Sequence, residues 1–294
     1  MAVHATTLVM AAEPPVRLAD PMAAPALSGV SSSWTLRHVL TANATISFVL
    51  ASMINSLLHE SAHAAAGIVQ ELTPTISPFS VEFAPEGTTS QQVVTAAAGP
   101  LFSLVMGLVL MAVARTWGRG IVRLFWMWLS FMGVMNFAGY CFVAPFAHAG
   151  DTGQILALLD APLVISVLVG LVGAAGIIWL ARRFAVEVKR YASDLTVERQ
   201  LAFYPWLLGT PIILVLGALE LATFDIPVAS LILILMYDVA FGIFAPMQFN
   251  FRTRVHNTLE PLGVTRVSVT GLAVTVAVSV LSVVLAAAGG LTLG

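Results

Sequence analysis

One short segment combines residue types that can bind a metal ion and activate water. Residues 57–63 read Leu-Leu-His-Glu-Ser-Ala-His, so that His59 and His63 are four positions apart and Glu60 follows the first histidine. Residues four apart lie on one face of an α-helix, and both imidazoles can therefore reach the same ion. Two imidazoles suit Zn²⁺, and a catalytic zinc site keeps one position for a water molecule, which the metal makes a much stronger acid. Glu60 is the candidate catalytic base for this water.

A site of this kind needs a third ligand from elsewhere in the chain. Asp151 is the best candidate, because Gly150 and Gly153 beside it allow the backbone to turn sharply and bring the carboxylate toward the histidines. His148, three residues earlier, is the alternative ligand. Asp151 could instead act only as the N-cap of the next helix. The sequence therefore predicts one Zn²⁺ per chain, held by the two histidines and one further residue.

The composition indicates that these residues lie in a membrane protein. Of the 294 residues, 59% are hydrophobic and 10% are Asp, Glu, Lys or Arg, and the mean hydropathy is +0.94. Soluble domains average roughly 45–50% apolar and about 25% charged residues. A net charge of −2, no cluster of basic residues and a single cysteine exclude a nucleic-acid partner and a disulfide scaffold. We expect an integral, multi-pass protein whose solvent is the lipid bilayer.

Seven stretches are long and apolar enough to cross a bilayer. None has the alternating pattern of a membrane β-strand, and helices satisfy their backbone polar groups internally. The fold class expected is all-α, a polytopic membrane helix bundle of about seven transmembrane helices, with a short β-prone segment at 75–83 after the first. The predicted spans are 40–69, 93–114, 121–146, 161–181, 204–224, 226–246 and 267–290.

The first predicted span thus carries three ionisable side chains within five residues. Such groups are expensive in the membrane unless they are paired, hydrated or coordinated, and they mark functional sites. The alternative is that His59, Glu60 and His63 merely end the helix at the lipid interface.

Basic residues alternate between the connections and predict an orientation. Arginine and lysine occur before the first span and in every second connection after it, whereas the intervening connections have none. The positive-inside rule then puts the amino terminus in the cytoplasm, and we expect the cell membrane as the location. The basic positions are Arg17, Arg37, Arg115, Arg119, Arg123, Arg182, Arg183, Lys189, Arg190, Arg199, Arg252, Arg254 and Arg266.

The metal-binding pattern inside a membrane helix resembles the site-2 protease family of intramembrane zinc metalloproteases. Three further features match in order: the β-prone segment 75–83, the Ala-Ala-Ala-Gly-Pro-Leu sequence at 96–101, and the region of Asn136, Pro145 and Asp151. Ser103 stands where this family often has asparagine. The similarity covers residues 57–154.

The resemblance implies zinc ligation by His59, His63 and Asp151, with Glu60 as the general base and Asn136 holding the substrate backbone. It also implies a zinc metalloendopeptidase whose substrates and partners are the spans of other membrane proteins. On this interpretation residues 1–36 form a disordered tail, 37–160 a metalloprotease-like membrane core, and 161–294 further transmembrane helices of unknown role.

Two other functions are compatible with the same residues. A metal- or proton-coupled transporter could use His59, His63 and Asp151 together with Glu220 and Asp238 of the later spans. A membrane protein that binds a structural metal and has no proteolytic activity is the third alternative. The glutamate between the histidines favours the enzyme, because a carrier has no need of a general base.

Overall fold

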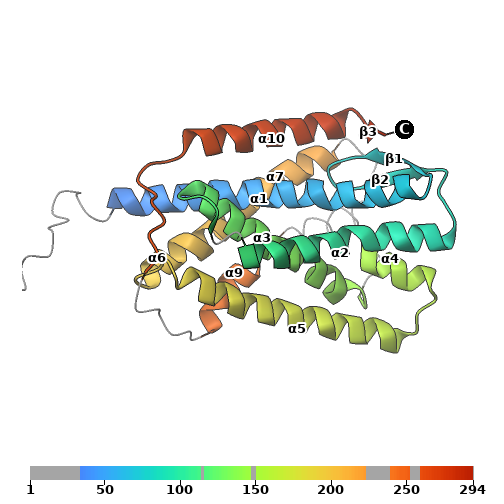
Figure 1. Cartoon of the computed structure of the whole chain (residues 1–294), viewed down its shortest axis with the longest axis horizontal. Helices are drawn as coiled ribbons and strands as arrows, with labels where there is room; N and C mark the ends of the chain where they lie inside the picture. Colours follow the sequence, from blue (N-terminus) through green and yellow to red (C-terminus); the bar gives the residue numbers. More distant parts are fainter. Residues whose placement is uncertain (1–33, 114–115, 147–149, 223–238, 252–258, 294) are drawn as a thin grey trace, which may run out of the picture.

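The computed structural model describes residues 34–113, 116–146, 150–222, 239–251 and 259–293. Six of its helices are long and apolar enough to span a membrane. They form one bundle, in which α1 runs through the middle of the view in Figure 1. The protein is therefore an all-α, membrane-spanning helix bundle, as predicted.

The long helices follow the predicted spans closely. They are α1 (Trp34–Val69), α2 (Thr89–Val113), α3 (Ile121–Val143), α5 (Leu163–Val188), α7 (Tyr204–Leu221) and α10 (Val269–Ala287). The shorter helical segments are α4 (Asp151–Leu158), α6 (Leu195–Glu198), the π-helix η2 (Arg199–Phe203), α9 (Phe244–Met247) and the 3-10 helix η3 (Gln248–Asn250).

Two boundaries differ most from the sequence prediction. Helix α1 begins at Trp34, inside the segment expected to be a disordered tail, whose residues 1–33 lie outside the described part of the chain. Helix α5 continues to Val188 instead of ending at 181, because Arg182 and Arg183 lie on its exposed face while Phe184 stays buried. Residues 182–188 therefore continue the helix with one exposed and one buried face, after the fully apolar stretch has ended.

The predicted span at 226–246 is only partly described. Residues 226–238 lie outside the described ranges, and the remainder contains α9. Phe244 of α9 is fully buried and belongs to the hydrophobic core.

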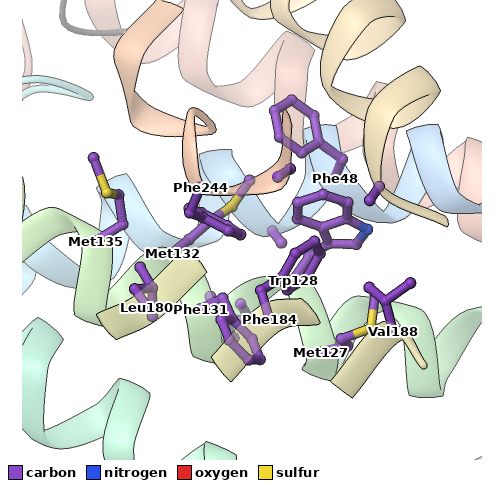
Figure 2. Close-up of a cluster of buried hydrophobic side chains, with 14 of the residues drawn as sticks. Phe48, Met127, Trp128, Phe131, Met132, Met135, Leu180, Phe184, Val188 and Phe244 are labelled. Carbon is purple, nitrogen blue, oxygen red and sulfur yellow. The ribbon is translucent and has the colours of Figure 1, made fainter. Parts of the chain in front are cut away.

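An aromatic cluster joins α1, α3, α5 and α9 (Figure 2). The Trp128 ring of α3 lies 4.9 Å from the Phe48 ring of α1 and 5.0 Å from the Phe184 ring of α5. The Phe184 ring in turn lies 5.0 Å from the ring of Phe244. Edge-to-face and tilted pairs at these distances are favourable, and they fix α3 between its neighbours.

Glycines let α3 approach α2 and α5 closely. A Cβ atom on Gly107 of α2 would lie 2.7 Å from the carbonyl oxygen of Ser130 in α3. A Cβ atom on Gly173 of α5 would lie 2.3 Å from the backbone nitrogen of Phe142 and 2.6 Å from the carbonyl oxygen of Ala138. Small residues at such crossings are typical of membrane helices, where close van der Waals contact drives association.

A small antiparallel sheet lies at one end of the bundle (Figure 1). Strands β1 (Thr73–Ile76) and β2 (Val81–Ala84) form a hairpin after α1, as the β-prone segment predicted. The third strand, β3 (Leu291–Thr292), follows α10 and pairs with β1, so that the strand order is β2-β1-β3.

The opposite end of the bundle carries a network of charged side chains. Arg190, just after α5, donates from Nε to Glu260 at 3.0 Å, and Lys189 pairs with Glu198 of α6. Arg123 of α3 donates to the hydroxyl of Tyr191 at 3.3 Å. These contacts join the start of α3, the end of α5 and the segment before α10.

The α3–α5 crossing gives the first prediction. We expect Gly173→Ala to lower the free energy of unfolding by about 1–3 kcal/mol, because its Cβ would collide with backbone atoms that side-chain rotation cannot move. Thermal unfolding in detergent measures this change. Ala175→Val is the control, because residue 175 lies on the exposed face of the same helix. Equal stability of Gly173→Ala and the wild type would contradict the backbone contact.

Candidate metal centre

Folding brings three potential metal ligands to one point. The Nε2 atoms of His59 and His63 are 3.0 Å apart, and Oδ2 of Asp151 lies 2.9 Å from the first and 3.3 Å from the second. Donors around a tetrahedral ion at about 2.0–2.2 Å are about 3.3–3.6 Å apart. The three atoms therefore need to separate by only a few tenths of an ångström to surround a metal ion, and two imidazoles with one carboxylate suit that ion chemically.

Two residues of α2 hold the imidazoles in the orientation that metal binding requires. His63 Nδ1 lies 2.7 Å from the carbonyl oxygen of Thr95, which can only accept a hydrogen bond. The proton of the neutral ring is therefore on Nδ1, and the lone pair of Nε2 is directed at the centre. His59 Nδ1 lies 3.1 Å from the Ser103 hydroxyl. Partners of this kind fix the tautomer and ring plane of metal-bound histidines.

A glycine permits α2 to come this close to the histidines. A Cβ atom on Gly99 would lie 2.3 Å from His63 Nε2 and 2.8 Å from His59 Cε1. Thr95, Gly99 and Ser103 are four positions apart, so that they share one face of α2. This face provides the two orienting oxygen atoms and the space for the rings.

Asp151 is directed to the centre by a sharp turn before α4. Gly150 has φ +74°, in the left-handed region that glycine readily adopts, and it occupies the N-cap position of α4. The N-cap interpretation of Asp151 is therefore wrong: Asp151 is the first residue of the helix and its carboxylate faces the histidines. A negative charge there is also favoured by the helix dipole. The rival ligand His148 lies outside the described residues.

Tyr140 of α3 links the two halves of the centre. Its ring stacks on the ring of His59 at a centroid distance of 5.4 Å and an interplanar angle of 16°. A Cβ atom on Gly150 would lie 2.8 Å from the same tyrosine ring, so that the ring packs against the backbone that carries Asp151. Tyr140 could not be predicted from the sequence, because no local pattern connects it to the histidines.

The centre is largely buried, with one more accessible side. His59 is 2% exposed, Glu60 5% and His63 6%, whereas the Asp151 side chain is 18% exposed. Glu60 follows His59 in α1, is buried, and interacts electrostatically with His63 and Asp151. The position beside the metal ligands suits a group that exchanges protons with a bound water.

Other predicted residues are not among the three ligands. Asn136 is buried in α3, and its Oδ1 atom has no hydrogen-bond partner within the described part of the chain. Its role in substrate binding stays a prediction. Glu220 is buried in α7, and Asp238 lies outside the described residues.

No protein-family model matches this sequence, and comparisons with curated proteins and with solved structures found no match either.

The contact between α2 and the imidazoles gives a prediction on metal binding. We expect Gly99→Ala to lower zinc affinity at least tenfold, because the added methyl group would occupy the space of the two rings. Metal analysis of the purified protein and competition with a chelator measure the affinity. Gly107→Ala is the matched control, since its methyl group would strain the α2–α3 contact and leave the rings alone. Loss of zinc in both variants would contradict a local effect.

The stacking of Tyr140 gives a second prediction on the same centre. Tyr140→Leu should weaken zinc binding roughly tenfold, because it removes the aromatic ring that stacks on His59 and packs against the turn at Gly150. Tyr140→Phe retains the ring and should bind zinc more tightly than Tyr140→Leu. The chelator competition assay distinguishes the two variants, and unchanged affinity in Tyr140→Leu would contradict a positioning role.

Proposed function

We propose that the protein is an intramembrane zinc metalloprotease that hydrolyses peptide bonds in or near the spans of other membrane proteins. The observation that carries the proposal is the convergence of Asp151 of α4 on His59 and His63, which lie with Glu60 in the buried part of the membrane-spanning helix α1. A zinc protease needs these four functions together: two imidazole ligands, a third ligand and a base. The resemblance to the site-2 protease family supports the same assignment.

The residues of the centre divide the chemistry between them. His59, His63 and Asp151 would hold Zn²⁺, which supplies Lewis-acid polarisation of a carbonyl group and acidifies water. The Glu60 carboxylate accepts a proton from the attacking water and then donates it to the nitrogen of the leaving amine. Thr95 and Ser103 keep the imidazoles in place while the proton moves. The burial of Glu60 excludes bulk water from this transfer.

The β-hairpin lies beside the segment of α1 that carries the histidines, and this supports a role in substrate binding. Ser56 of α1 donates to the carbonyl oxygen of Pro78 at 3.0 Å, and a Cβ atom on Gly67 would collide with the Phe83 ring of β2. The hairpin thus contacts α1 on both sides of the segment from His59 to His63. A helical substrate hides its carbonyl groups in hydrogen bonds, and an extended segment could pair with a sheet edge instead.

The charge distribution supports an orientation for this enzyme. The first turns of α1 and α3 and the last turns of α5, which carry basic residues of the described ranges, lie at the end of the bundle opposite the sheet (Figure 1), and the positive-inside rule assigns that end to the cytoplasm. His59 and His63 lie in the last third of α1, toward the sheet. The metal centre is then nearer the outer face of the cell membrane.

Glu60→Gln tests the proposal directly. We expect the variant to retain zinc and to lose cleavage by a factor of about 10²–10⁴, because glutamine keeps the shape of the side chain and cannot take the proton. A mixture of single-span membrane peptides in detergent micelles, with products mapped by mass spectrometry, measures cleavage. Glu82→Gln is the control, because Glu82 is an exposed acid on the neighbouring hairpin.

Two outcomes would contradict the assignment. Retained zinc with full cleavage by Glu60→Gln would remove the proposed base. Zinc flux into liposomes that is equal in the wild type and in Glu60→Gln, without cleavage by either, would favour the transporter.

A further inference from the structure

Strand β3 occupies the edge of β1 that β2 leaves free, so that a distant segment of the same chain completes the sheet. Strand β1 lies between β2 and β3, and β3 pairs with it in antiparallel register, with Thr75 opposite Thr292 and Ile76 opposite Leu291. Leu293 donates from its backbone N–H to the carbonyl oxygen of Pro74 at 2.9 Å. The hydroxyl groups of Thr75 and Thr292 are 2.9 Å apart. Residues far apart in the sequence therefore complete one sheet.

Strand β3 pairs with the edge of β1 in the way that a bound peptide pairs with a sheet. An extended peptide adds to a sheet through main-chain hydrogen bonds, and the side chains that alternate along it provide selectivity. Leu291–Thr292 binds β1 in this manner, as an extended segment that follows α10. The hairpin that carries β1 contacts α1 at Ser56 and Gly67, on either side of the metal ligands.

Strand β3 is suited to leave this edge. It has two residues, and both are exposed. Gly289 and Gly290 precede it with φ +76° and +90°, so that a glycine turn connects it to α10. A Cβ atom on Gly290 would lie 2.7 Å from the carbonyl oxygen of Ile76, so that the turn rests directly on β1. A short strand after two glycines can detach without disturbing the helix that precedes it.

We propose that segment Gly289–Leu293 is an internal competitor that occupies the edge of β1 and is displaced by an extended peptide segment of the substrate. The inference rests on the proposed function, and it adds a regulatory step to it. Occupation by β3 keeps the edge closed to short or weakly binding peptides. A substrate whose unwound segment pairs with Pro74, Thr75 and Ile76 opens it.

A reversible cross-link between β1 and β3 tests the proposal. Thr75→Cys and Thr292→Cys are combined in a chain that also carries Cys141→Ala and Glu60→Gln. The two positions face each other in the register and their hydroxyl groups touch, a geometry that a disulfide can bridge. The probe is a fluorescent Gly-Gly-Leu-Thr-Leu peptide, the sequence of residues 289–293, and its binding is measured by fluorescence anisotropy.

We expect the reduced protein to bind the probe at least tenfold more tightly than the oxidised protein, and reduction of the cross-linked sample to restore binding. The single-cysteine variants should not respond to oxidant. Equal binding in both states would overturn the proposal, and so would failure of the disulfide to form in folded protein. Since Glu60 is replaced, this readout is independent of proteolysis. Absence of cleavage in the wild type would then contradict the proposed function alone.

A second pair of variants keeps the test independent of engineered cysteines. Leu293→Pro removes the N–H group that bonds to Pro74, whereas Thr292→Pro alters a position whose N–H points away from β1 in the antiparallel pattern. We expect Leu293→Pro to increase probe binding more than Thr292→Pro does. The reverse order would contradict the pairing as the closing contact.

Discussion

The close approach of two imidazoles and a carboxylate is the constraint on which the rest of the structure depends. Their ligating atoms lie within 3.3 Å of one another in an apolar bundle. Groups of this kind are costly to bury unless their charges and lone pairs are satisfied together. One divalent ion could satisfy all three at once, because it would bind both Nε2 lone pairs and balance the charge of the carboxylate. The surrounding helices must therefore bring the ligands together and leave room for the ion.

The glycines of the bundle are explained by this requirement. Gly99 lets α2 reach the imidazoles, and Gly107 lets the same helix lie against α3. Helix α3 in turn carries Tyr140, whose ring packs on His59 and on the turn before Asp151. The aromatic cluster around Trp128 holds α3 against α1 and α5 (Figure 2). The metal centre is thus supported by packing in which each helix contacts the next through small or flat residues.

Local patterns explain which features could be predicted from the sequence. The spans and the pair His59 and His63 follow from hydropathy and helical period, and Asp151 follows from the glycines beside it. Three contacts could not be predicted: the stacking of Tyr140 on His59, the contact of Ser103 with His59, and the pairing of β3 with β1. Each joins segments that are distant in the sequence. The contact of α1 with the start of α10 is of the same kind, since Asn43 accepts a hydrogen bond from the backbone N–H of Ser268 and donates one to the carbonyl oxygen of Arg266.

The way the ligands are held favours a resident ion over a transported one. A carrier must release its cargo, and its ligands must change position or exposure during the cycle. Here the Nδ1 atoms of both histidines are bound to α2, and the turn that carries Asp151 packs against Tyr140. Releasing the ion by moving these ligands would break several contacts among three helices. Glu60 is not part of this framework, since it lies beside the ligands and outside the triad. Ligands held this firmly, with one separate carboxylate beside them, would suit a hydrolase better than a carrier, and this supports the proposed function.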